Sequence, residues 1–253
     1  MPPNTDGVLY LLFLLGPLLI LQRSLHRETQ AIFLLLTRRT EFAIMLFSLL
    51  FFPGVFLHET SHYLTARLLG VRTGKFSLVP RVQPGGRLQL GYVETASSDW
   101  LRDALIGAAP LLAGGCVVAY IGLFHLGLPA IWAPLVAGNV SAALSAIPTL
   151  LHQPDFWLWF YLGFVVSSTM FPSPSDRRAW VPLTLVIVAL FAFSLLVGAG
   201  PWMAQHLATP FNRLLLGVDV VLGISVFIHL VLVPPLYGTR ILLSRLTGLQ
   251  VVG

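Results

Sequence analysis

The pentad His58-Glu59-Thr60-Ser61-His62 combines residue types and a spacing that can carry out hydrolytic chemistry. Residues four apart lie on one face of a helix, so His58 and His62 can bind the same metal ion. Glu59 is then placed to accept a proton from a metal-bound water. The pattern predicts a metal-dependent hydrolytic site with two histidine ligands and Glu59 as its general base.

The surroundings of this pentad are apolar from residue 42 to residue 70. An apolar run of this kind is expected to lie inside the bilayer, where an ionisable side chain is costly and by default marks a functional site. A chance match to the pattern is the alternative, and a single buried histidine is more often merely hydrogen-bonded. Three ionisable groups within five residues of an apolar helix favour a shared role, which predicts an intramembrane site.

Two histidines do not complete a catalytic zinc site, because such a site takes three protein ligands and a water. The third ligand is expected within an apolar run or at its end. This condition leaves six candidates, which are His125, His152, Asp155, Asp176, Asp219 and His229. The residues alone do not choose among them.

The stretch from His58 to Arg72, HETSHYLTARLLGVR, resembles the active-site helix of the site-2 protease family of intramembrane zinc metalloproteases. The segment Gly107-Ala108-Ala109-Pro110 is similar to a small-residue segment of that family. The resemblance covers roughly residues 42–176. It implies a zinc-dependent endopeptidase (a hydrolase) that performs intramembrane proteolysis, cutting peptide bonds in or near transmembrane segments of membrane proteins.

In that family the third ligand is an aspartate that follows an asparagine and a pair of prolines and precedes a glycine. Asp176 is the nearest match, because Pro172 and Pro174 stand before it. Arg177 replaces the glycine, and a serine replaces the asparagine. The resemblance therefore implies Zn²⁺ held by His58, His62 and Asp176, with Ser168 or Asn139 binding the substrate backbone. Asp155 stays open as an alternative ligand, since it follows His152-Gln153-Pro154 with Asn139 and Pro148 upstream.

The elements that must position these residues are predicted to be membrane-spanning helices. The 253 residues are 56% hydrophobic and only 10% charged, and their mean hydropathy is +0.84. Soluble domains carry about a quarter charged residues. We therefore expect an all-α polytopic membrane protein with about six transmembrane helices of ~20 residues. The expected apolar runs are 8–22, 42–70, 104–124, 129–151, 156–171 and 179–198, with 214–236 as a seventh candidate.

A single membrane-embedded domain is expected over residues 1–253. Residues 1–41 are predicted to form an N-terminal span with a basic segment that is either interfacial or a continuation of the first helix. Residues 42–176 are the predicted metalloprotease core, and residues 177–253 supply C-terminal spans. The one cysteine, Cys116, excludes an intrachain disulfide framework and a zinc site of several thiolates.

Residues 71–96 interrupt the apolar helical pattern. Apolar residues there alternate with a period near two on either side of Pro84-Gly85-Gly86. This pattern predicts one or two β-hairpins at the membrane surface, and their edge could receive an unwound substrate strand. A surface loop explains the alternation equally well.

The net charge of +5 is attributed to arginines that flank spans and meet anionic lipid headgroups. The expected partners are the lipid bilayer and a transmembrane protein substrate, with no nucleic acid. An integral, multi-pass location in a bacterial plasma membrane is expected, while orientation and oligomeric state are left open.

Two other classes of function are compatible with the sequence. A catalytically degenerate, site-2-protease-like scaffold would bind transmembrane helices without cutting them, and the altered positions at Ser168 and Arg177 favour it slightly. The intact pentad argues against it, because a scaffold does not need Glu59. A solute or metal transporter would usually show polar residues in several spans or symmetry between halves.

Overall fold

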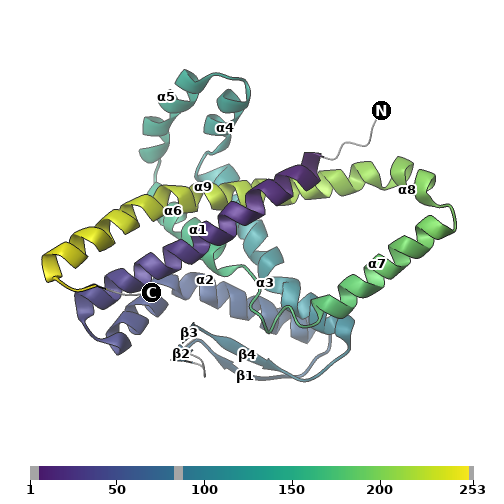
Figure 1. The fold of residues 1–253 in the computed structure, drawn as a ribbon, viewed down its shortest axis with the longest axis horizontal. Helices are drawn as coiled ribbons and strands as arrows, with labels where there is room; N and C mark the ends of the chain where they lie inside the picture. Colours follow the sequence, from purple (N-terminus) through teal and green to yellow (C-terminus); the bar gives the residue numbers. More distant parts are fainter. Residues whose placement is uncertain (1–5, 83–87, 251–253) are drawn as a thin grey trace.

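The computed structural model describes residues 6–82 and 88–250, which are mainly α-helical with a small β element (Figure 1). In chain order the elements are α1 (Asp6–Thr37), α2 (Thr40–Leu68), β1 (Thr73–Ser77), β2 (Arg81–Val82), β3 (Leu88–Gln89), β4 (Tyr92–Thr95), α3 (Trp100–Tyr120), the π-helical turn η1 (Ile121–His125), α4 (Pro129–Val136), α5 (Val140–Leu151), α6 (Phe156–Thr169), α7 (Trp180–Leu196), α8 (Gly200–His206) and α9 (Ala208–Thr247).

Within residues 6–82 and 88–250, four helical segments are long and apolar enough to cross a membrane, namely α1, α2, α3 with η1, and α9. A fifth is added if α7 and α8, which meet at 114°, count as one bent span. The chain therefore has the architecture of a helical membrane protein. The expected number of about six spans is not reached by these lengths, because α5 and α6 have only 12 and 14 residues.

The apolar run 129–151, expected as one span, is broken into the two short helices α4 and α5, which pack against each other. Gly138 adopts φ 75°, a left-handed conformation that ends α4 and favours glycine. Asn139 then caps α5 by accepting a hydrogen bond from the backbone N–H of Ala142 at 3.0 Å. A hydropathy profile gives no sign of the break at Gly138 and Asn139.

The N-terminal basic segment continues the first helix, so that α1 runs unbroken for 32 residues. Helices α1 and α9 lie side by side (Figure 1). At one end the N–H of Gly7 donates to the side-chain oxygen of Asn212 at 2.9 Å. At the other end the guanidinium of Arg240 is bonded to the buried carboxylate of Glu28.

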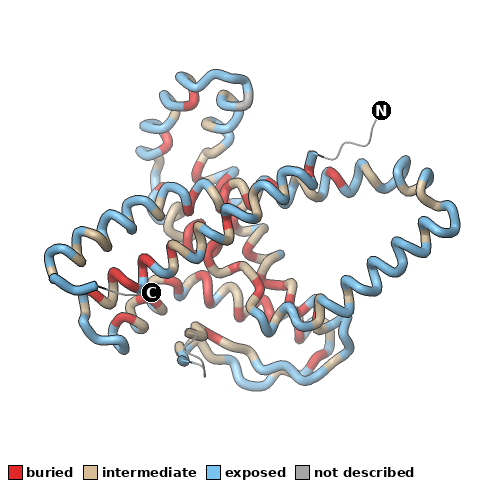
Figure 2. Tube along the Cα trace, viewed as in Figure 1, coloured by how far each residue is buried: buried red, intermediate tan, exposed pale blue. Residues whose placement is uncertain are grey.

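Buried residues gather where α1, α2, α3, α6 and α9 cross, whereas α7 has none (Figure 2). Phe47, Phe51 and Phe164 form part of this core, with successive ring centroids 4.6 and 5.3 Å apart. An apolar helix with every residue at least partly exposed suits lipid on all sides. In the short helix α6, in contrast, residues 163–168 are all buried by neighbouring helices.

The β element confirms that residues 71–96 contain paired strands rather than only a loop. Strand β1 pairs antiparallel with β4, and β2 pairs antiparallel with β3. The predicted turn at 84–86 lies outside the described residues. The strands lie along α2, below it in the view of Figure 1, and Asp99 then caps α3 through the N–H groups of Leu101 and Arg102.

Candidate metal centre

Helix α2 carries the whole pentad and turns both imidazoles to the same side. The Nε2 atoms of His58 and His62 are 3.2 Å apart. Glu59 and His62 are buried, each 7% exposed, within an otherwise apolar helix. The predicted helical placement of the pentad is therefore observed.

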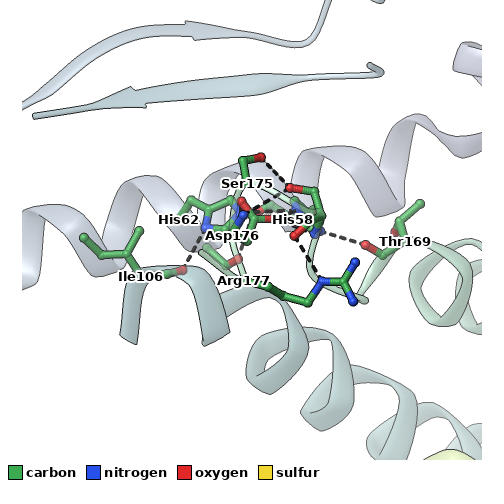
Figure 3. A network of polar contacts seen from close by, with 9 residues as sticks. His58, His62, Ile106, Thr169, Ser175, Asp176 and Arg177 are labelled. Carbon is green, nitrogen blue, oxygen red and sulfur yellow. Dashed lines mark hydrogen bonds and ion pairs between the residues drawn. The ribbon is translucent and has the colours of Figure 1, made fainter. Parts of the chain in front are cut away.

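Asp176 reaches these histidines from the segment that follows α6. One of its carboxylate oxygens lies 3.7 Å from His58 Nε2, and the other lies 3.5 Å from His62 Nε2. In a tetrahedral zinc site with bonds of about 2.0–2.1 Å, ligand atoms are separated by about 3.4 Å. The three side chains, which face one another in Figure 3, thus have the spacing of ligands around one ion.

The remaining nitrogen of each imidazole is held by a backbone carbonyl. His58 Nδ1 is 2.7 Å from the carbonyl oxygen of Thr169, and His62 Nδ1 is 2.8 Å from that of Ile106. A carbonyl only accepts, so each Nδ1 must carry the proton and each neutral ring presents the lone pair of its Nε2. Two such lone pairs facing each other repel unless a cation or a proton lies between them. This arrangement is typical of metal-binding histidines.

The surroundings of the Asp176 carboxylate favour its ionised form. Burial disfavours its charge, but His58 and His62, which donate to it through Nε2 whenever those nitrogens are protonated, and the N–H of Ser173 outweigh burial and hold the pKa of Asp176 well below its ordinary value. The Ser173 contact is a backbone N–H that donates to the carboxylate at 2.7 Å. An ionised carboxylate beside two neutral imidazoles is a suitable donor set for a divalent cation.

Helix α3 allows this approach because it has a glycine where Asp176 passes. A Cβ at Gly107 would lie 2.1 Å from the backbone oxygen of Asp176. The preceding residue, Ile106, supplies the carbonyl that holds His62. One turn of α3 therefore supports two of the three candidate ligands.

A cavity of about 940 Å³ opens beside the three ligands, and Glu59 lines it. Residues 88–93 of the β element form another part of its wall, and Gln22 and His26 of α1 a third. Gly91 is pressed against the general-base candidate, since a Cβ there would be 2.8 Å from Glu59 Cγ. A cavity lined by both polar and apolar residues therefore lies beside the pentad.

Asp155 does not join this group. It precedes α6, whereas the metal centre lies beyond the other end of this 14-residue helix, ~20 Å away along the axis. Asn139 caps α5 and does not line the cavity. In the described part of the chain, the other candidates also lie outside the ligand cluster, and these are His125, His152, Asp219 and His229.

Sequence reasoning missed the groups that orient the ligands. The carbonyls of Ile106 and Thr169 carry no sequence signal, because every residue has one. Sequence reasoning also missed Gln22 and His26 of the cavity wall, which did carry a signal, since they lie four residues apart at the end of an apolar run and so share one helix face.

Comparisons with protein-family models, curated proteins and solved structures found no match to this chain. The resemblance to site-2 proteases therefore stays a prediction, and the functional argument depends on the geometry of the site.

Proposed function

We propose that this chain is an intramembrane zinc metalloprotease that hydrolyses peptide bonds in or near transmembrane segments. The observation that carries the proposal is the convergence of His58 Nε2, His62 Nε2 and the Asp176 carboxylate, with each imidazole fixed through Nδ1. Glu59 lies beside them on a cavity wall, within a bundle of membrane-type helices. A purely structural cluster would not need this acid.

In the proposed mechanism His58, His62 and Asp176 would hold the ion beside the cavity. Bound zinc would polarise the scissile carbonyl and lower the pKa of its water to about 7. Glu59 takes one proton from this water as the oxygen attacks the carbonyl carbon, and then delivers it to the departing amine nitrogen. The C–N bond breaks, the second proton of the water also passes to the amine, and the products are a carboxylate and a protonated amine.

The substrate is proposed to enter as an extended segment. A helix buries its carbonyls in its own hydrogen bonds, so a transmembrane substrate must unwind before attack. The cavity has the metal centre on one side and residues 88–93 on another, which provides a strand-like surface next to the reacting groups. Added pairing along such a surface is a common way to bind an unwound chain.

The finer expectations about membrane placement belong to the same proposal. About six spans are obtained if the bent α7–α8 pair and α6 are added to the four long helices. Helix α6 can be short because its C-terminal half is buried in protein, where the carbonyls of Ser168 and Thr169 accept hydrogen bonds from other helices. The location is proposed to be a bacterial plasma membrane.

The proposal is tested with wild-type protein and Glu59→Gln, each reconstituted with a solubilised extract of bacterial membrane proteins. New N-termini are then identified by mass spectrometry. We expect Glu59→Gln to keep its zinc, because Glu59 is not a ligand, and to lose the products that wild type generates. Removing one catalytic proton carrier should lower the rate by about 10²–10⁴-fold.

Three results would argue against proteolysis. Identical products from both proteins would exclude Glu59 as the base. Zinc retention and capture of transmembrane segments without any cleavage would support the degenerate scaffold instead. Zinc flux into vesicles would support a transporter.

A further inference from the structure

The C-terminal end of α6 is hydrogen-bonded to three other helices, α1, α2 and α9. The last carbonyls of a helix have no partner within it and must find one elsewhere. Here the carbonyl of Thr169 accepts from His58 of α2 at 2.7 Å. The neighbouring carbonyl of Ser168 accepts from the side-chain amide of Gln22 of α1 at 2.5 Å.

Helix α9 holds the same turn through a side chain. The Oγ of Ser168 is 3.1 Å from Nε2 of His229. Nδ1 of His229 is 2.8 Å from the carbonyl of Ser225, so Nδ1 carries the proton and Nε2 accepts from the serine hydroxyl. Ser168 is 1% exposed and His229 is fully buried. The hydroxyl proton of Ser168 is thus donated to α9.

The presence of polar side chains at positions 22 and 229, inside an apolar bundle, needs a physical explanation. His229 is fully buried and Gln22 is half-buried, and a polar side chain buried in an apolar bundle is costly unless it is hydrogen-bonded. Gln22 and His229 both direct their bonds to Ser168, the residue before Thr169. The carbonyl of Thr169 in turn sets the direction of the His58 ring.

We propose that Gln22 and His229 are positioning residues that hold the end of α6 so that His58 presents Nε2 to the metal. This inference rests on the proposed zinc site. The partial negative charge at the end of α6 also favours the Nδ1-protonated ring and raises the basicity of the ligand nitrogen. Neither residue belongs to the ligand cluster, so their effect on the metal is transmitted through Ser168 and Thr169.

The test compares zinc affinity in Gln22→Met and His229→Phe with that in Gln30→Met. Gln30 is the matched control, because it lies on α1, is exposed, and makes no hydrogen bond within the described part of the chain. Loss of a group that orients a metal ligand typically lowers affinity by 10–100-fold. We expect about a tenfold loss in both variants and none in the control.

A second readout separates positioning from general destabilisation. With Co²⁺ in place of zinc, the visible absorption reports ligand geometry, and we expect Gln22→Met and His229→Phe to change it at saturating metal. His229→Gln should restore the wild-type spectrum, because its amide oxygen can accept from Ser168. If His229→Phe does not fold, Ser168→Ala makes the same test by removing only the hydroxyl.

The outcomes distinguish the two proposals. Unchanged zinc affinity and an unchanged Co²⁺ spectrum in Gln22→Met and Ser168→Ala, beside a wild-type protein that binds metal, would overturn the positioning role alone. A wild-type protein with no zinc site would overturn both. Altered spectra in a zinc protein that cleaves nothing would support the positioning role and contradict proteolysis.

Discussion

The two candidate histidine ligands are each fixed by a backbone carbonyl from another helix, Thr169 of α6 and Ile106 of α3. The pentad could be found from its histidine spacing, whereas Asp176 was singled out by the resemblance to site-2 proteases, through the two prolines that precede it. The carbonyl partners could not, since they arise only when α2, α3 and α6 pack together. Ser168 shows the same limit, because its type suggested substrate binding while its contacts place it against His229.

A prediction at the residue level concerns Gly91, which packs against Glu59. A Cβ at this position would lie 2.8 Å from Glu59 Cγ and 3.0 Å from Val55 Cγ1. Gly91→Ala should therefore displace the general base while the ligands stay in place. A misplacement of about 1 Å can lower a catalytic rate by about 10²-fold.

The measurement for Gly91→Ala is the rate of product formation together with zinc content. We expect normal zinc and a strongly reduced rate. Gly16→Ala is the control, because nothing lies within 4 Å of a Cβ there. Full activity in Gly91→Ala would show that Glu59 is not held by this contact.

Helix α3 offers a test at the level of elements. Gly107→Ala would place a methyl group 2.1 Å from the backbone of Asp176, whereas Gly115→Ala on the same helix meets only a side-chain carbon at 3.7 Å. We expect Gly107→Ala to push the Asp176 segment away and lower zinc occupancy, with a loss of about 1–3 kcal/mol in stability from overpacking. Gly115→Ala should retain zinc, and equal zinc in both variants would contradict this role of α3.

An element could be predicted only where it leaves a recognisable pattern in the sequence. The paired strands in 71–96 were visible as a period of two, and α2 as a long apolar run. The break at Gly138 and Asn139 was not recognised, because the run 129–151 is apolar on both sides of it. The length of α6 was hidden as well, since hydropathy does not tell whether lipid or protein surrounds a helix.

At the scale of the whole molecule, helices α1 and α9 are joined by an ion pair between Glu28 and Arg240. Glu28 is 2% exposed and is bonded to Arg240, while the more exposed Arg27 lies 3.2 Å from its other oxygen. Removing one partner of a buried pair costs about 3–5 kcal/mol, whereas replacing both by apolar groups is often neutral. We expect Arg240→Leu to lose about 3 kcal/mol, near the low end because Arg27 remains.

The stability of Arg240→Leu is measured by thermal unfolding in detergent beside the double variant Glu28→Leu/Arg240→Leu. The double variant should regain most of the lost stability. If it is less stable than Arg240→Leu, the ion pair is a net stabiliser and the account of α1 and α9 is wrong.

The class of the whole molecule followed from composition, and the helical membrane architecture agrees with it. The number of spans did not follow, because it depends on how α6, α7 and α8 are placed in the bundle. These are tertiary properties that a count of apolar residues does not contain.

The most direct test of the central claim is the zinc content of purified wild type, Asp176→Ala and Asp155→Ala, measured by mass spectrometry after gentle purification. We predict about one zinc per chain in wild type and in Asp155→Ala, as one three-ligand site requires, and a large loss in Asp176→Ala. A chelator should remove the zinc, and added Zn²⁺ should restore it. A wild type without zinc, or a loss in Asp155→Ala with none in Asp176→Ala, would contradict the proposed metal centre.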